Sequence, residues 1–369
     1  MKIIVLQDHL RSGGTERHSI LLARELGELG HAAELVTFRP GGRLATSVAS
    51  PHRSLQPFDT RIDWFAPGLL RALLRGRPDI VLCMGKTANC YAGRIQGRAD
   101  VLGLGTRVVA TLRAGDALPG LYYNSVRRAA HLVANSRETA DHLASSQGMD
   151  RSRISVIHNS LVFPQAGPGR DDGLRSRLGA GPSSMVLLSV AMFRPSKNQR
   201  DLILMAAGLP KALDWRLWFI GDGPERGACE HLAKARGLLD RIRFLGFQDD
   251  PAPYYRSADV AVHASREEAL SNFLIEAQAH GLPAVAARAL GIRECFIEGR
   301  TGWMLEQGDL DGFRSALVRL ASDTTETRSA RSAEARDFAR QSFDTRRQVG
   351  AYVTLFESLL GEAKPTPRP

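Results

Sequence analysis

The sequence of 369 residues lacks the features of several classes of protein. No apolar run reaches the roughly 20 residues that a membrane-spanning helix needs. The chain begins directly in a predicted strand, without a signal peptide, so we expect a cytoplasmic protein. Its few cysteines are scattered and match neither a metal site nor a disulfide framework, which indicates a reduced compartment. These cysteines are Cys83, Cys90, Cys229 and Cys295.

Missing motifs argue against two further classes. No Gly-x-Gly-x-x-Gly motif follows the first predicted strand, residues 2–6, so a dinucleotide-dependent dehydrogenase is a poor interpretation. The net charge of +10 is compatible with nucleic-acid binding, but no groove-reading motif or aromatic-basic platform accompanies it. A nucleic-acid-binding protein is therefore the least favoured interpretation.

Strand-like apolar runs do occur, and they alternate with helical stretches from end to end. This alternation is typical of parallel α/β sheets, and the length suits about two domains. Residues 163–173 are rich in proline, glycine and charge, which predicts an interdomain linker. We expect an N-terminal domain of residues 1–163, a linker of residues 164–182, a C-terminal domain of residues 183–344 and a last helix of residues 345–360.

Two glutamates, Glu268 and Glu276, stand eight positions apart around a predicted helix start. Ser271 and Asn272 are strong N-cap types, and residues 281–283 (Gly-Leu-Pro) predict the helix end. Glu268 should lie in the loop before the helix and Glu276 in its early turns, where a parallel sheet usually binds ligand. A helix start also offers free N–H groups to an anion such as a diphosphate. Taken alone, the pair is better explained as one acid that stabilises the helix dipole and one solvated acid.

A turn with two cations precedes this helix in the chain. The apolar run of residues 185–190 predicts a buried strand, and residues 201–205 look helical. Arg194 and Lys197 lie between them, where a fixed turn can hold both charges over phosphate. Alone, such a turn is ordinary basic surface. Together with the two glutamates it provides what a nucleotide-sugar site needs: cations for a leaving diphosphate, an acid for ribose hydroxyls and a carboxylate near the sugar.

These motifs, in this order, resemble those of glycosyltransferase family 4, the retaining group 1 enzymes that use nucleotide-sugar donors. Residues 13–17 match the family's glycine turn before its first helix. Further similar runs lie at residues 78–81, 134–136, 154–159, 219–224, 244–247 and 258–260. The resemblance implies the GT-B architecture: two Rossmann-like, doubly wound parallel-sheet domains facing a central cleft, the first for the acceptor and the second for the donor. It also implies that the helix of residues 345–360 packs back on the first domain.

The resemblance implies roles for individual residues as well. Lys197 and Arg194 would bind the diphosphate, Glu276 the ribose hydroxyls, and Glu268 would lie at the reacting sugar. Further residues on the donor side would be Leu270, Ser271, Asn272, Gly14 and Phe247. Those on the acceptor side would be Gly13, Glu16 and Arg113.

Two positions depart from the family pattern. Many members carry Gly-Arg-Leu where this chain has residues 191–193, so the usual arginine falls at Met192 and we assign its role to Arg194. A histidine that often follows the strand matching residues 108–112 is absent, and Arg113 stands there. Arg113 either faces the donor in its place or belongs to a crevice that is built differently.

The charge of the leaving diphosphate indicates how the reaction would be catalysed. Breaking the anomeric bond puts negative charge on the diphosphate, which fixed cations and helix N–H groups stabilise without a metal or another cofactor. No Asp-x-Asp dyad is positioned to hold a metal. Retention would proceed by front-face attack or through a covalent intermediate on Glu268, and the sequence leaves both open. The runner-up function is another GT-B enzyme, a sugar-nucleotide epimerase or a phosphorylase, whose acid and histidine set or cofactor lysine we do not find.

The positive charge is concentrated in the predicted acceptor half. Residues 1–163 hold 21 Lys and Arg against 13 Asp and Glu, a net +8, whereas residues 164–369 hold 28 against 26, a net +2. This asymmetry suits an anionic membrane surface or a lipid-diphosphate acceptor. We expect a UDP-sugar donor, a glycan or lipid-linked acceptor of bacterial surface polysaccharide, and peripheral association with the cytoplasmic face of the inner membrane. Residues 65–77 alternate paired leucines with arginines and form either an interfacial helix or a helix packed on its own sheet.

Overall fold

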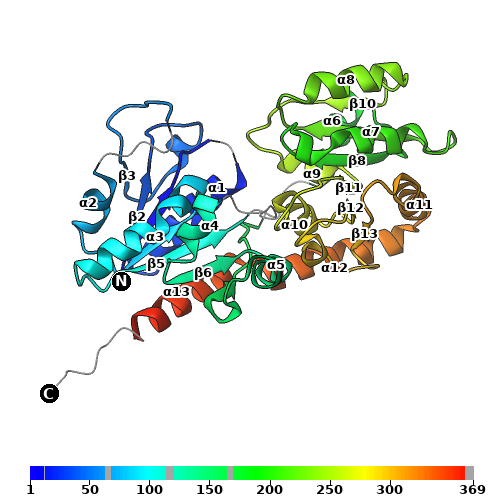
Figure 1. The fold of residues 1–369 in the computed structure, drawn as a ribbon. Coiled ribbons are helices and arrows are strands. Elements are labelled where there is room, and N and C mark those ends of the chain that lie inside the picture. Colours follow the sequence, from blue (N-terminus) through cyan, green and yellow to red (C-terminus); the bar gives the residue numbers. More distant parts are fainter. Residues whose placement is uncertain (12, 63–67, 114–119, 164–168, 362–369) are drawn as a thin grey trace. The chain divides into compact units, whose positions relative to one another are not determined.

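The computed structural model describes the chain except residues 12, 63–67, 114–119, 164–168 and 362–369. The chain forms two compact units (Figure 1). The first unit contains Met1–Ser160 together with Thr345–Pro369, and the second contains Leu161–Asp344. Each unit is built around one parallel sheet, so the α/β class with two doubly wound sheets is confirmed.

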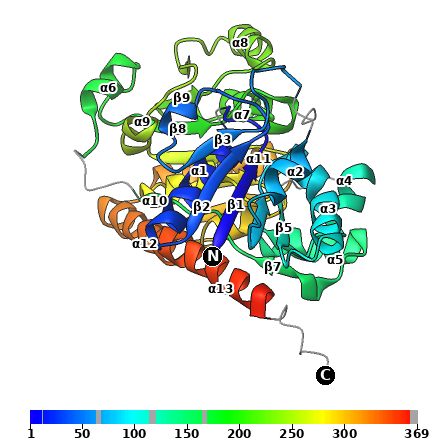
Figure 2. The ribbon, with the colours of Figure 1, turned by 90° about the vertical axis from the view of Figure 1, so that its left-hand side faces the viewer.

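The first unit holds a seven-stranded sheet in the order β3-β2-β1-β4-β5-β6-β7, and Figure 2 shows β1, β2 and β3 side by side. Its strands are β1 (Lys2–Gln7), β2 (Ala32–Thr37), β3 (His52–Ser54), β4 (Ile80–Cys83), β5 (Arg107–Leu112), β6 (His131–Ala134) and β7 (Ile154–Val156). Along β1, Ile3 and Val5 join the core on one face of the sheet, and Ile4 and Leu6 join the core on the other. This is the two-residue period of a strand that is buried on both faces.

Helices cover both faces of this sheet. They are α1 (Gly14–Glu28), α2 (Leu69–Leu74), α3 (Lys86–Val101), α4 (Gly120–Val126), α5 (Arg137–Gln147) and α13 (Thr345–Gly361), with the short 3₁₀ helices η1 (Ala45–Ser47) and η2 (Arg151–Arg153). The chain returns to this unit in α13, whose Val349, Tyr352 and Phe356 share a core with Val5 of β1 and Leu22 of α1. Helix α13 therefore completes a core that contains the first strand.

Helix α2 lies within the arginine-leucine segment singled out in the sequence. Its Leu69, Leu73 and Leu74 are buried in a core that also contains Val81 of β4, and Leu70 packs against the same core. The interpretation of this segment as a helix that inserts its leucines into a membrane is therefore wrong, because those side chains are already covered by the unit's own sheet. Residues 65–67 of the segment lie outside the described residues. No described helix has the length and apolar character needed to cross a membrane.

The second unit holds a six-stranded sheet in the order β10-β9-β8-β11-β12-β13. Its strands are β8 (Met185–Val190), β9 (Trp215–Ile220), β10 (Ile242–Phe244), β11 (Val260–His263), β12 (Ala284–Ala287) and β13 (Gly302–Leu305). Alternate residues again face separate cores, Leu187 on one side of the sheet and Leu188 on the other. The buried strand predicted over residues 185–190 is confirmed as β8.

The helices of the second unit complete its two outer layers. They are α6 (Asp172–Arg177), α7 (Gln199–Ala207), α8 (Arg226–Ala235), α9 (Ala252–Ser257), α10 (Asn272–Ala279), α11 (Leu310–Ala321) and α12 (Thr325–Phe343), with 3₁₀ helices η3 (Pro195–Lys197) and η4 (Ile292–Cys295). Helix α6 falls inside the range predicted as a linker. It forms because the Asp171 side chain caps its start by accepting a hydrogen bond from the N–H of Leu174 at 2.8 Å, and its Arg175 is buried. This stretch therefore belongs to the second unit.

The strand order places a switch point in the second unit. The chain runs from β8 outward to β9 and β10, then crosses to β11 on the other side of β8 and continues to β12 and β13. In open parallel sheets, ligands bind beyond the carboxyl ends of the strands at such a reversal. The loops after β8 and β11 are therefore where a ligand site is expected.

Candidate active site

The two loops at the switch point carry the residues singled out in the sequence. The loop after β8 contains η3 with Lys197, and the loop after β11 contains Glu268 and leads into α10. These residues lie 71 positions apart in the chain, yet Lys197 Nζ donates to Glu268 Oε1 at 2.5 Å. Because β8 and β11 are adjacent parallel strands, their carboxyl ends deliver both side chains to one point.

A histidine completes this cluster. Nε2 of His263, the last residue of β11, lies 2.9 Å from the same Oε1 atom of Glu268. Both side chains are largely enclosed, with 3% of His263 and 11% of Glu268 exposed, whereas 25% of the Lys197 side chain is exposed. The lysine is therefore the member of the cluster most open to an incoming anion.

The environment keeps the Glu268 carboxyl ionised. Burial by itself raises its pKa, but the hydrogen bond with His263 and the charge of Lys197 together outweigh burial and lower the pKa to about 2. The glutamate is therefore negative at neutral pH and sets a fixed negative charge beside Lys197.

Backbone hydrogen bonds join the two loops. The carbonyl oxygen of Ser196 accepts from the N–H of Arg266 at 2.8 Å and from the Ser265 hydroxyl at 3.1 Å. The turn then leaves η3 through Asn198, which has φ +50° and belongs to a residue type that tolerates the left-handed region. These contacts fix Lys197 relative to Glu268 independently of their ion pair.

A glycine loop after β9 supports the same turn. A Cβ atom built at Gly221 would collide with the carbonyl oxygen of Ala191, and one at Gly223 would lie 2.4 Å from that of Phe193. Only glycine allows this close approach of two backbones. The run at residues 219–224 therefore braces the segment that leads to Arg194.

Helix α10 starts as the sequence predicts. Ser271 is its N-cap, and the Ser271 hydroxyl accepts a hydrogen bond from the N–H of Leu274 at 3.4 Å. The helix ends before Gly281, which has φ +79°. Glu276 lies in the second turn, and its Oε2 accepts a hydrogen bond from the Tyr255 hydroxyl at 2.7 Å. Tyr255 thus holds the carboxylate that we assign to the ribose. Leu270 and Ser271 are buried, and Asn272 is half-buried.

Arg194 and Phe247 lie outside the Lys197 cluster. Arg194 is exposed, and its side chain makes no hydrogen bond or ion pair within the described part of the chain. It is tied to the turn through its carbonyl, which accepts from the N–H of Lys197 at 2.9 Å. Phe247 is half-buried in the loop after β10, whose Gly246 carbonyl accepts from the N–H of Gly221 at 2.8 Å. Both residues therefore lie on the loops at the carboxyl edge of the sheet.

The remaining predicted residues lie in the first unit. Gly13 is the N-cap of α1, Gly14 is the first residue of that helix, and the Glu16 carboxylate lies where a side chain on Gly13 would be. Arg113 follows β5, and its guanidinium donates to Asn159 Oδ1 at 2.7 Å and to the Tyr352 hydroxyl at 3.4 Å.

Arg113 thus connects β5 to α13 within the first unit. Beside it, burial and then the charge of Arg113 lower the pKa of His18 well below its usual value, so this histidine is neutral at neutral pH.

Two side chains that contact the predicted glutamates were not predicted from the sequence, His263 and Tyr255. A histidine at the end of a strand beside an acid loop was a usable signal for His263. Tyr255 lies on a helix and carries no local pattern. Among the residues that the structure describes, no three histidine, cysteine or carboxylate side chains are grouped as metal ligands would be.

Comparisons with known proteins show the family of the chain. Residues 12–161 match the family model described as Glycosyltransferase Family 4, and residues 184–323 match the model described as Glycosyl transferases group 1. The lipopolysaccharide core biosynthesis glycosyltransferase LpsE of Rhizobium meliloti is 28% identical over 325 residues, which span 85% of this chain and 87% of that protein. D-inositol 3-phosphate glycosyltransferase 2 of Catenulispora acidiphila is 27% identical over 356 residues, spanning 84% and 82%.

Solved structures share the fold. Anabaena HepE in complex with UDP-glucose superimposes with a TM-score of 0.82 at 22% identity, covering 97% of this chain and 100% of that one. The apo form of the lipopolysaccharide outer core galactosyltransferase WaaB gives 0.73 at 18% identity, covering 97% and 99%. The units thus have the GT-B fold. Two family models that together span both units, and relatives alike over most of their length, show that the chain belongs to glycosyltransferase family 4, the group 1 glycosyl transferases.

Proposed function

We propose that this glycosyltransferase moves a sugar from a UDP-sugar to a glycan or lipid-linked acceptor of bacterial surface polysaccharide, with retention of the anomeric configuration and without a metal. The observation that carries the proposal is the Lys197–Glu268–His263 cluster at the switch point. The names of LpsE and of the UDP-glucose complex of HepE support the choice of acceptor and donor class.

The second unit binds the donor in this proposal. Lys197 and the exposed Arg194 approach the diphosphate from one turn, and the N–H groups at the start of α10, from Leu270 to Asn272, add the positive end of a helix dipole. Phosphate bound there attracts Lys197 away from Glu268, because a diphosphate carries more charge than one carboxylate. As the bond to the sugar breaks, these fixed donors stabilise the growing charge on the leaving group.

The two glutamates have different tasks. Glu276, oriented by Tyr255, accepts hydrogen bonds from ribose hydroxyls. Glu268, ionised and enclosed, lies where positive charge grows on the donor sugar, and His263 holds its orientation. Front-face attack and a covalent intermediate on Glu268 both use this negative charge, and they differ in whether a bond to Oε forms.

The first unit binds the acceptor in this proposal, with Gly13, Glu16 and Arg113 on that side and Gly14 reaching the donor. Arg71, Arg75 and Arg77 are exposed on and after α2, so the basic half attracts an anionic surface by charge without inserting leucines. Peripheral association with the cytoplasmic face of the inner membrane belongs to the proposal.

A donor screen tests the function. Hydrolysis of a panel of nucleotide-sugars should be fastest for one UDP-sugar and should persist after treatment with EDTA. NMR of the transfer product should show the same anomeric configuration as the donor. Inversion of the anomeric configuration would reject retention. Loss of turnover in EDTA would reject metal independence, and a reaction that requires inorganic phosphate would reject transferase action.

A further inference from the structure

A cavity of about 640 Å³ lies in the second unit, and Tyr255, which holds Glu276, is one of its lining residues. Ser184, Asp259 and Pro283 line it, and they immediately precede β8, β11 and β12. Lys197 and Glu268 follow the opposite, carboxyl ends of β8 and β11. The cavity and the candidate active site therefore lie at opposite ends of one parallel sheet. Its volume is within the range of about 300–1,000 Å³ that is typical of small-molecule sites.

Arginine dominates the charged part of the cavity wall. Within the described chain, the only carboxylates on this wall are those of Asp259 and Asp323. The arginines are Arg170, Arg256, Arg328, Arg331, Arg336 and Arg340. Both carboxylates are already paired. Arg331 donates to Asp323 Oδ2 from Nε at 3.2 Å and from Nη2 at 3.0 Å.

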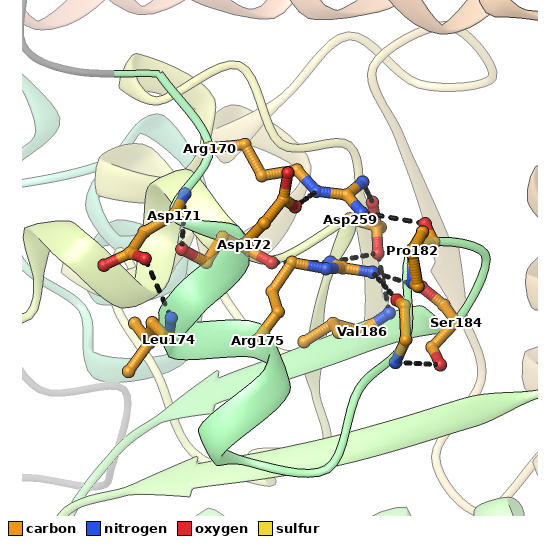
Figure 3. A network of polar contacts seen from close by, with 11 residues as sticks. Arg170, Asp171, Asp172, Leu174, Arg175, Pro182, Ser184, Val186 and Asp259 are labelled. Atoms are coloured by element: carbon orange, nitrogen blue, oxygen red, sulfur yellow. Dashed lines mark hydrogen bonds and ion pairs between the residues drawn. The ribbon is translucent and has the colours of Figure 1, made fainter.

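Asp259 is the centre of the network in Figure 3. The buried Arg175 donates to its Oδ2 at 3.0 Å, and the N–H of Val186 donates to the same atom at 2.7 Å. Arg170 Nη1 lies 3.8 Å from Oδ1. The single negative charge of Asp259 is therefore shared between Arg175 and Arg170.

Three guanidinium groups of the wall have no ion pair with a carboxylate among the described residues, namely those of Arg256, Arg328 and Arg336. Arg336 donates to the Ser332 hydroxyl at 2.8 Å, and Arg328 donates to the Ala321 carbonyl at 3.0 Å. Arg340 is 3.9 Å from Asp337, and the Nε atom of Arg256 is buried without a hydrogen-bond partner. The wall therefore holds uncompensated positive charge, which repels itself unless an anion is bound.

Two of these groups come from α12, which also carries Arg340 on the same face. Arg328, Arg336 and Arg340 are separated by eight and four positions, which is the spacing of residues on one helix face. Gly281, at the end of α10, lies so close that a Cβ atom there would collide with Arg336 Nη1. The absence of a side chain at this position leaves room for the guanidinium at the cavity wall.

Uncharged groups form the rest of the wall. The rings of Tyr255 and His280 stack with centroids 4.9 Å apart, and Leu213, Leu282 and Leu320 provide apolar surface. Burial and then the charge of Arg256 lower the pKa of His280 to about 4, so it is neutral at neutral pH and offers hydrogen bonds without charge.

We propose that this cavity is a second ligand site that binds a small soluble molecule carrying at least two phosphate groups. Guanidinium forks match phosphate oxygens in geometry as well as in charge, and three of them exceed what a single phosphate would neutralise. The concave shape and the mixed ring and leucine surface suit a compact molecule better than a flat membrane. The proposal does not depend on the identity of the sugar donor.

Calorimetry with inorganic pyrophosphate tests the proposal. Pyrophosphate should bind the parent protein at two sites, because the donor turn is also cationic. Arg336→Ser with Arg340→Ser should lower the affinity of one site by about ten- to hundredfold and leave the other intact. Lys197→Ala should remove the other site and leave the cavity site. The exposed pair Lys211→Ser with Arg236→Ser, which removes the same net charge from the same unit, should change neither.

Several results would overturn the proposal. One binding event that disappears with Lys197→Ala would show that the cavity does not bind pyrophosphate. An equal loss in the Lys211 and Arg236 control would show that only overall charge matters. Arg328→Ser, at an exposed position, is a second variant in case the double variant unfolds, and unchanged affinity of both sites would reject the proposal. If the double variant loses sedimentation with phosphatidylglycerol vesicles but keeps pyrophosphate binding, the ligand is a membrane headgroup and not a soluble molecule.

Discussion

At the residue scale, the active site depends on one buried carboxylate with two partners. Glu268 holds Lys197 and His263 through the same oxygen, at 2.5 and 2.9 Å. A buried charge that loses a partner is costly, so changes here affect stability as well as chemistry. The variants below separate the two effects by measuring both.

Lys197→Ala should lose transfer while keeping its fold. Removal of one preorganised cation that faces a developing negative charge costs about 10²- to 10³-fold in rate. Steady-state kinetics with the best UDP-sugar would measure the loss, and circular dichroism would check the fold. Lys211→Ala, an exposed lysine of the same unit, is the matched control and should retain parental rates. If Lys197→Ala turns over within a few-fold of the parent, Lys197 does not bind the diphosphate.

The lowered pKa of Glu268 predicts a pH dependence of stability. The carboxyl has a usual pKa of 4.5 and a folded pKa of about 2, so the unfolded chain binds its proton first as pH falls. The contribution is therefore complete above about pH 4.5 and is lost between that pH and about 2. Urea unfolding at pH 5, 4 and 3 should show a steeper loss for the parent than for Glu268→Gln. Parallel slopes would mean that another carboxylate accounts for the acid sensitivity.

Glu276→Ala and Glu268→Ala should give different defects. Glu276→Ala should weaken calorimetric binding of UDP by about ten- to hundredfold, because the ribose hydroxyls are present in the bare nucleotide. Tyr255→Phe should weaken it by only about two- to tenfold, since the carboxylate remains but loses the hydroxyl that orients it. Glu268→Ala should leave UDP affinity nearly intact and abolish transfer. The reverse pattern would exchange the two roles.

At the scale of elements, α2 shows that one amphipathic sequence pattern is compatible with two environments, a sheet and a membrane. Its leucines belong to the core of the first unit, whereas Arg71 and Arg75 are exposed. The same amphipathic pattern serves a helix on a sheet and a helix on a membrane, because both cover one apolar face. Only the exposed arginines of this segment are therefore available to attract a membrane surface.

The arginines of this region should therefore bind anionic vesicles by charge alone. Each basic residue near such a surface contributes about 1 kcal/mol, and salt screens this attraction. Sedimentation with phosphatidylglycerol vesicles should decrease as salt rises, and changing Arg71, Arg75 and Arg77 together to Glu should abolish it. Affinity for UDP should be unchanged, because Lys197, Glu268 and Glu276 lie in the other unit. A parent protein that stays in the supernatant even at low salt would favour a soluble acceptor.

At the scale of the whole molecule, helix α13, which follows the second unit in the chain, is part of the first unit's core. Phe356 of α13 is fully buried together with Leu22 of α1 and Val5 of β1. The first unit is thus complete only after the second has been synthesised.

Phe356→Ala should destabilise the protein strongly. Truncation of a buried phenylalanine typically costs about 3–5 kcal/mol, the sum of lost burial and the cavity left behind. Thr354→Ala, at an exposed position of the same helix, should change the free energy of unfolding by less than about 0.5 kcal/mol. Denaturant unfolding of both variants would test this. Equal effects would mean that α13 does not support the core.

The sequence alone determined the local parts of this protein. The apolar run of β8, the N-cap Ser271 and the helix end before Gly281 were predictable, because each depends on neighbouring residues and on the period of the backbone. The ordered motifs also identified the family, and with it the GT-B fold.

The tertiary structure alone decided which distant side chains meet. Lys197 meets Glu268 because strand order brings the loops after β8 and β11 together, and Tyr255 meets Glu276 because α9 packs beside α10. The arginine-lined cavity collects Arg256 from α9 and Arg336 from α12, which are 80 positions apart in the sequence. It also decided that the leucines of α2 face a sheet. No local pattern encodes such meetings, because they arise from the packing of whole elements against one another.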